Sequence, residues 1–173
     1  MALASLSRLT VIWKSNISVG VKIKLYRSLV LSVVLYGCES WTLTADMERR
    51  LQAFEYKCYR RILRISYREH KTNVYVRNKV EMCAGVQEPL LSIVKRRKLA
   101  WFGHVCRHDS LSKTILQGTV EGGRSRGGQI KTWTDNIKEW TGQDIATLIR
   151  IAEDRIRWRT LCAEASNVVP LRP

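Results

Sequence analysis

The sequence predicts an all-α protein, a bundle of about six to eight helices, and two kinds of observation support this. Apolar residues recur three and four positions apart along most of the chain, which is the spacing of one helix face. The 173 residues include only 3 Pro and 10 Gly, too few for the frequent turns of a β-sandwich. Hydrophobic residues make up 45% of the chain, which suits a packed core and excludes a disordered tail.

Two helices are expected in the N-terminal part. Residues 4–14 form a weak first helix, and Ser18 is a suitable N-cap for a second that runs to about Tyr36. The β-branched residues of the second leave a strand over residues 29–36 as the alternative. Gly37 is expected to end this element, because glycine readily adopts the left-handed conformation found at helix ends.

The clearest helix follows Thr44, which can cap it. Thr72 is then expected to open a short helix through about Glu81, and Pro89 fits the first turn of a helix that runs to about Arg107. The helix after Thr44 has an apolar stripe, which is typical of a helix packed on a core. This stripe consists of Met47, Leu51, Phe54, Cys58 and Ile62.

A Gly/Arg-rich segment divides the chain. Glycines surround two arginines between residues 118 and 128, which predicts a loop, with a short strand over 115–120 as the alternative. Beyond it we expect a helix ending at Gly142, and then two helical faces separated by a break near Glu153. The expected divisions are a bundle with basic helices over 1–113, a Gly/Arg-rich loop or small β-hairpin over 114–130, helices over 131–165, and a tail over 166–173.

The charge balance narrows the class of partner. The 30 Lys and Arg residues outnumber the 15 Asp and Glu residues, so the net charge is +15. Such an excess favours polyanions, with nucleic acid first and an anionic membrane surface second. No apolar stretch approaches the ~20 residues that span a bilayer, the start lacks a signal-peptide pattern, and the five cysteines form no CxxC pair. We therefore expect a protein of the nucleus or cytoplasm that is neither secreted nor embedded in a membrane.

Basic clusters are the strongest functional signal in the sequence. Cations bind phosphates and indole rings stack on bases, so clusters of Lys and Arg beside Trp are typical of nucleic-acid-binding grooves. Trp101 and His104 are either packing residues beneath such a surface or its stacking edge, and the amphipathic pattern favours packing. The expected phosphate ligands are Arg60, Arg61, Arg64, Lys95, Arg96, Arg97, Lys98, Arg124 and Arg126.

Catalytic and metal-binding patterns are weak by comparison. Gly123 and Gly128 have the spacing of a phosphate-binding P-loop, but Gln129 stands where that motif requires Lys. His104 and His108 share a helix face and would bind a metal if Cys83 came near, although two exposed histidines at a helix end are the interpretation we favour. We therefore expect no catalytic residue, no metal and no cofactor.

Four segments carry a more specific pattern. They read LYGCESW at 35–41, RRKLAWFGHV at 96–105, GGRSRG at 122–127 with WTDNI at 133–137, and AEDRIRWR at 152–159. In the same order they resemble the LYGxExW, RRRLxWxGHV, GxRxRGRPxxxWxDxI and AxDRxxWR motifs of reverse transcriptases from LINE-type (non-LTR) retrotransposons. The matching positions that we expect to be structural are Tyr36, Gly37, Glu39, Trp41, Trp101, Gly103, His104, Trp133, Asp135, Asp154, Arg155 and Trp158.

The resemblance covers about residues 8–162 and implies the thumb of the polymerase and the region after it. In that family these helices flank the duplex of RNA template and DNA primer, so residues 1–113 would be the thumb-like part. The metal-binding [YF]xDD motif of the polymerase is absent, since no two Asp residues are adjacent, and no endonuclease domain is recognised. Gly128 and Ile130 stand where the family usually has basic residues or Pro, which removes positive charge from that loop.

Together these observations predict a non-catalytic fragment of a retrotransposon-encoded reverse transcriptase that binds the phosphates of a template–primer. Its expected partners are an RNA–DNA hybrid or a nucleic-acid duplex, together with other parts of the polyprotein. One alternative is a helical protein-interaction module that docks through Trp133, Ile137 and Trp140. The other alternative is an inert, truncated relic of the element.

Overall fold

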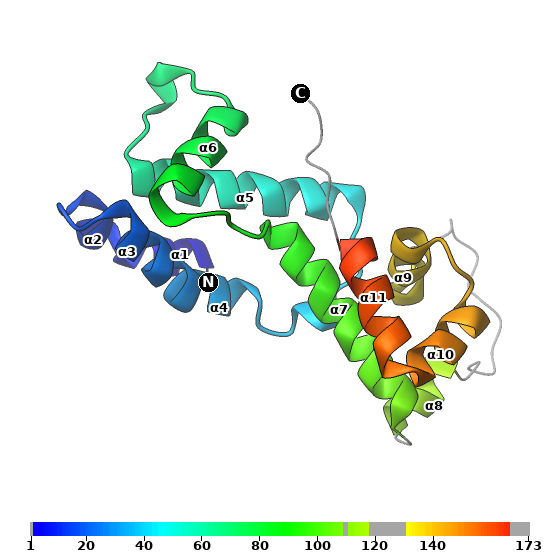
Figure 1. The fold of residues 1–173 in the computed structure, drawn as a ribbon. Helices are drawn as coiled ribbons and strands as arrows, with labels where there is room; N and C mark the ends of the chain where they lie inside the picture. The colour runs from blue at the N-terminus through cyan, green and yellow to red at the C-terminus, as the bar shows by residue number, and fades with distance from the viewer. Residues whose placement is uncertain (1, 109–110, 118–130, 167–173) are drawn as a thin grey trace. The chain divides into compact units, whose positions relative to one another are not determined.

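The computed structural model describes residues 2–108, 111–117 and 131–166, and the regular structure in these ranges is entirely helical (Figure 1). The all-α prediction is therefore confirmed for the described part of the chain. The chain divides into two compact units, one of Met1–Cys38 and Ala45–Leu91 and the other of Glu39–Thr44 and Ser92–Pro173. We call them unit 1 and unit 2 and describe each by itself. None of the described helices has both the length and the apolar character needed to cross a membrane.

The N-terminal part of unit 1 begins with two short helices, α1 (Ala2–Arg8) and α2 (Thr10–Lys14), instead of the single helix expected over 4–14. The break at Leu9 lets the buried Trp13 turn back, and its Nε1 donates a hydrogen bond to the carbonyl of Leu6 at 2.8 Å. The next helix begins as expected, because the side chain of Ser18 accepts a hydrogen bond from the amide of Val21.

The helix after Ser18 continues without a strand. It runs through α3 (Val19–Leu25), a π-helical segment η1 (Tyr26–Leu31) and α4 (Ser32–Val34), so the strand alternative for residues 29–36 is wrong. Buried residues spaced three and four apart hold this face against the rest of unit 1, and their packing outweighs the strand preference of β-branched side chains. Gly37 follows with a φ of 64°, the left-handed conformation expected after the last turn.

The rest of unit 1 is built around α5 (Ala45–Leu63), which packs against α3 and α6 (Asn73–Ala84). The expected stripe of α5 faces inward at Cys58 and Ile62, whereas Met47 at its start is exposed. The hydroxyl of Thr72 caps α6 by accepting from the amide of Tyr75 at 3.2 Å, as predicted. A short helix, η3 (Tyr67–Glu69), lies between α5 and α6.

One buried carboxyl group fastens α5 to the start of the next helix, α7 (Leu90–Arg107). Glu55 accepts hydrogen bonds from the amide of Leu90 at 2.9 Å and from the hydroxyl of Tyr59 at 3.2 Å. Burial raises the pKa of the Glu55 carboxyl above its ordinary value, although these hydrogen bonds oppose the shift. Unit 1 ends in the first turn of α7.

Unit 2 contains η2 in part (Cys38–Ser40), most of α7, α8 (Leu111–Gln117), α9 (Trp133–Thr141), α10 (Ile145–Glu153) and α11 (Arg155–Ser166). Gly142 ends α9 with a φ of 68°, and the chain breaks at Asp154, so both expectations for this part are confirmed. Asp154 also caps α11, because its carboxylate accepts from the amides of Ile156 at 2.9 Å and Arg157 at 3.2 Å.

The loop or hairpin expected over residues 114–130 is wrong for its first four residues, because these belong to α8. Residues 114–117 are helical, because neither Gly nor Pro interrupts the sequence between Leu111 and Gln117. The remainder of the Gly/Arg-rich segment, 118–130, and the tail, 167–173, lie outside the described residues. The division between the units falls near the start of α7, whereas the sequence analysis placed a boundary at residue 113.

The core of unit 2 lies between α7, α9, α10 and α11. Trp133 and Trp140 are partly buried against it, and Ile137 is fully buried within it. The aromatic face that would serve a docking module is therefore turned toward the core of its own unit. The buried residues of this core are Leu99, Phe102, Cys106, Ile137, Leu148, Ala152, Trp158 and Cys162.

Candidate nucleic-acid interface

A hollow of about 1050 Å³ on unit 1 gathers three of the expected phosphate ligands. We call it the α5 groove. Arg60 and Arg61 lie in the last turn of α5 and Arg64 directly follows the helix, three and four positions after them, so that all three line the hollow. No acidic residue is among the described residues that line it. Its basic lining residues are Lys14, Lys57, Arg60, Arg61, Arg64, His70 and Lys71.

Neutral oxygen atoms hold two of these arginines in place. The Nη2 of Arg60 donates to the carbonyl of Lys71 at 3.0 Å and to the Oδ1 of Asn73 at 2.8 Å. The Nη2 of Arg61 donates to the hydroxyl of Thr10 at 2.7 Å. Hydrogen bonds to neutral acceptors orient a guanidinium without neutralising it, so both side chains keep their positive charge in the groove.

Arg64 has a more structural role. It follows α5 with a φ of 58°, and its guanidinium donates to the carbonyls of Trp13, Lys14 and Ser15 at the end of α2. The buried Lys22 donates to two of the same carbonyls, those of Trp13 at 3.0 Å and Ser15 at 2.7 Å. Two cations therefore satisfy the free carbonyls at the C-terminus of α2, the end that a helix dipole makes negative.

The groove also has an aromatic edge, which the sequence analysis missed. Tyr67 lines the α5 groove and is 90% exposed, and its ring lies 5.8 Å from the ring of His70. An exposed ring beside cations is a surface on which a nucleobase stacks. The available signal was a tyrosine a few residues after an arginine-rich helix end, but only the fold shows that the chain turns back there.

The run from Lys95 to Lys98 does not form one surface. Arg96 and Arg97 are exposed, but Lys95 is partly buried with its Nζ 5.1 Å from the centre of the Trp140 ring. Lys98 is fully buried, which corrects its assignment as a phosphate ligand. Successive helix residues point about 100° apart, so four consecutive cations cannot share one face.

Lys98 is instead the centre of a polar contact inside unit 2. Its Nζ donates to the carbonyl of Trp41 at 2.7 Å and to the Oδ1 of Asn136 at 2.8 Å, and it lies over the ring of Trp133 at 4.5 Å. Burial, with a smaller contribution from the charge of Lys131, lowers the pKa of Lys98 to about 7. The acceptor oxygens and the indole face favour the ammonium form, but removal from water has the larger effect.

This pKa predicts a stability that depends on pH. Between pH 7 and the ordinary lysine pKa of 10.5, the unfolded chain binds more protons at Lys98 than the folded chain does. The free energy of unfolding should therefore rise with pH, by roughly 2 kcal/mol between about pH 7 and 9. Urea titrations of the wild type and of Lys98→Met at both pH values check this, because the variant should lack the increase. An identical increase in both proteins would contradict it.

Two side chains of α9, those of Asn136 and Trp133, bind the backbone of the segment that contains Glu39 and Leu43. The amide of Leu43 donates to the Oδ1 of Asn136 at 2.7 Å, and the Nδ2 of Asn136 donates to the carbonyl of Leu43 at 2.7 Å. The Nε1 of Trp133 donates to the carbonyl of Glu39 at 2.8 Å. Asn136 was not singled out from the sequence, although a polar residue beside the apolar face of α9 was a usable signal.

Other family-like residues pack helices of unit 2 against one another or cap them. Trp158 donates from Nε1 to the carbonyl of Leu99 at 3.1 Å, and its ring lies where a side chain on Gly103 would be. The carboxylate of Asp135 completes a capping box with Thr132 at the start of α9, and these hydrogen bonds hold the pKa of Asp135 well below its usual range. Trp101 packs edge-on against Trp133 at 5.2 Å and is still 36% exposed, so part of its ring also faces the surface.

Three of the exposed family-like residues do not join these contacts. Tyr36 is 88% exposed, and His104 and Arg155 are also exposed. The rings of His104 and His108 lie 4.4 Å apart on α7. Over the described ranges, no three His, Cys, Asp or Glu side chains gather as metal ligands do. Arg124 and Arg126 lie outside the described residues.

Comparison with known proteins supports a link to mobile elements. The chain is 30% identical over 147 residues to an uncharacterised transposon-derived protein of Caenorhabditis elegans. The sequence has a transposon-derived relative. The aligned region covers 80% of this chain but only 52% of the relative, so the chain spans about half the length of the protein it matches. No protein-family model and no solved structure matches the chain.

Proposed function

We propose that the chain is a nucleic-acid-contacting part of a retrotransposon-encoded reverse transcriptase, and that the α5 groove binds the phosphates of its template–primer. The observation that supports this most directly is the α5 groove itself, a hollow lined by cations with no acidic residue among its described lining. The transposon-derived relative and the four family-like segments support the origin.

The groove suits a polynucleotide better than a small anion. Its volume of about 1050 Å³ is far larger than one phosphate group requires, and its basic residues come from three segments of unit 1. Arg60 and Arg61 supply oriented guanidinium groups, while Tyr67 offers a ring to an unstacked base. Together these are the phosphate-binding and stacking components of a groove for single strands or for a hybrid duplex.

The rest of the proposal follows from the same assignment. The chain acts without catalysis of its own, because its sequence has no adjacent Asp pair to hold the metal ions of a polymerase. It needs no cofactor, and it works in the nucleus or cytoplasm beside other parts of the polyprotein. Binding to phosphates is the step that this chain contributes.

The deciding experiment compares two pairs of neighbouring arginines on the same helix. Arg60→Gln/Arg61→Gln should weaken binding to an RNA–DNA hybrid about tenfold and reduce the log–log salt slope by about two, because two phosphate contacts are lost. Arg49→Gln/Arg50→Gln removes the same charge from exposed residues of α5 that pair with Asp46 outside the groove. This control should change affinity less than about twofold. Fluorescence anisotropy at two salt concentrations measures both.

A second variant guards against a purely structural effect of losing the Arg60 and Arg61 hydrogen bonds. Lys57→Gln changes one exposed groove residue and should reduce the salt slope by about one. Equal affinities for all three variants and the wild type would overturn the proposal. Salt-independent binding would do the same, since a phosphate-binding groove must release counterions. A chain that unfolds without cooperativity would instead favour the inert relic.

A further inference from the structure

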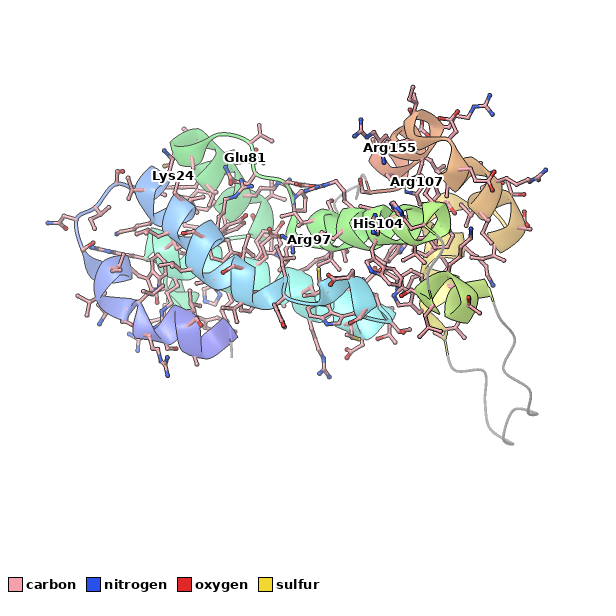
Figure 2. All side chains as sticks on the ribbon, turned by 90° about the horizontal axis from the view of Figure 1, so that it is seen from below. Lys24, Glu81, Arg97, His104, Arg107 and Arg155 are labelled. Carbon is pink, nitrogen blue, oxygen red and sulfur yellow. The ribbon has the colours of Figure 1, made fainter. Side chains whose placement is uncertain are left out.

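A second cationic hollow lies on unit 2, between α7 and α11. It has a volume of about 440 Å³, and no acidic residue is among the described residues that line it. Figure 2 shows three of its residues, His104 and Arg107 on α7 and Arg155 on α11, and they line the same hollow. We call it the α7–α11 hollow. Its cationic and titratable lining consists of Arg96, His104, Arg107, Arg155 and Arg159.

Helix periodicity and one glycine explain why these side chains meet. On α7, Arg96 and His104 are eight residues apart, which places them on one face about two turns apart. On α11, Arg155 and Arg159 are four apart and also share a face. Gly103 has no side chain to separate the helices, so the ring of Trp158 lies directly on α7 and forms the floor of the hollow.

Two arginines of the hollow have side chains without an acidic partner. Within the described ranges, the side chains of Arg155 and Arg159 make no hydrogen bond or ion pair. Arg107 donates from Nη1 to the carbonyl of Ala152 at 2.7 Å, and its buried Nε has no partner. The carboxylate nearest in sequence, Asp154, is engaged with the side chain of Arg157 and with the first amides of α11.

We propose that the α7–α11 hollow is a second phosphate-binding site, which holds the backbone of a polynucleotide independently of the α5 groove. The choice of a polynucleotide as the source of the phosphates rests on the proposed function. Guanidinium groups match phosphate oxygens in a planar, two-pronged geometry, and Arg155 and Arg159 present two of them side by side. The hollow therefore fits successive phosphates of one strand.

The two sites differ in how they treat bases. Trp158, the only aromatic residue other than His104 among the described lining residues, is 3% exposed and already packed on Phe102 at 5.2 Å. It cannot stack on a base, whereas Tyr67 in the α5 groove is exposed. The hollow therefore binds backbone alone and should contribute equally to single strands and duplexes, whatever their sequence.

The test removes the two α11 arginines from the full chain. Arg155→Gln/Arg159→Gln should weaken binding to a duplex and to a single strand by the same factor, about tenfold, and reduce the salt slope by about two. The matched control is Arg150→Gln/Arg157→Gln, which takes the same charge from exposed residues of unit 2 outside the hollow. It should change affinity less than about twofold.

Three comparisons decide the outcome. If the α11 pair weakens binding and the Arg60/Arg61 pair does not, this proposal stands and the proposed function of the α5 groove fails; the reverse result overturns this proposal alone. Equal effects of the α11 pair and its control would also overturn it, because net charge would then be sufficient. Vesicles containing phosphatidylserine provide the last comparison. A loss of vesicle binding with unchanged binding to nucleic acid would assign the hollow to a membrane surface.

Discussion

Gly103→Ala should destabilise unit 2 by about 3 kcal/mol or more, although alanine is the better helix former. A Cβ atom at this position would lie 2.1 Å from Nε1 and 2.4 Å from Cδ1 of Trp158, closer than real contacts allow. The ring is buried in the core and donates to the carbonyl of Leu99, so it cannot move aside without losing that hydrogen bond. Urea denaturation followed by tryptophan fluorescence measures the loss.

The sign of the effect separates packing from propensity. Helix propensity alone predicts that Gly103→Ala stabilises the chain by roughly 1 kcal/mol. A double variant with Trp158→Leu should recover part of the loss, because the smaller side chain leaves room for the new methyl group. A stabilised single variant, or losses that simply add in the double variant, would show that Gly103 and Trp158 are not in contact.

Asn136→Ala should cost about 4 kcal/mol, the second large effect. This one amide satisfies three buried groups, the amide and carbonyl of Leu43 and the ammonium of Lys98. Alanine leaves all of them without a partner on that side, and an ammonium that has lost an acceptor in the core is especially costly. The free energy of unfolding of the variant, measured by urea titration, checks this.

A double variant that also changes Lys98, which donates to Asn136, supplies the control. Lys98→Met/Asn136→Leu replaces a polar pair by apolar side chains and should cost less than the two single changes added together. Asn73→Ala changes an exposed asparagine whose Oδ1 accepts from Arg60, and it should cost about 1 kcal/mol or less. A similar small loss for Asn136→Ala would mean that segment 39–44 is not held by this residue.

Local chemistry was readable from the sequence, since helix ends depend on neighbouring residues alone. The caps at Ser18 and Thr72 and the helix end at Gly142 are confirmed for this reason. The strand alternative at 29–36 was wrong because packing of a helical face, which is a tertiary effect, outweighed the preference of β-branched residues. The break at Leu9 was missed because it depends on where Trp13 is buried.

The candidate sites show the same division between local and distant contacts. Arg60, Arg61 and Arg64 could be grouped in advance because they lie on one helix, but Tyr67 and Lys71 join them only after the chain turns back. Lys98 was misplaced because a run of cations in sequence does not reveal which member faces inward. Arg107 and Arg159 line one hollow although they are 52 positions apart in the sequence, and helix periodicity cannot predict such a distant contact.

Segment 39–44 belongs to unit 2, yet the residues on both sides of it belong to unit 1. The polypeptide therefore crosses from one unit to the other three times, and no single cut yields two intact pieces. A copy of the gene shortened at its 5′ side beyond codon 44 would encode α7 and everything after it, but not the backbone that Asn136, Lys98 and Trp133 hold. The shortened protein would therefore lack part of the core of unit 2, because segment 39–44 lies far from the rest of unit 2 in the sequence.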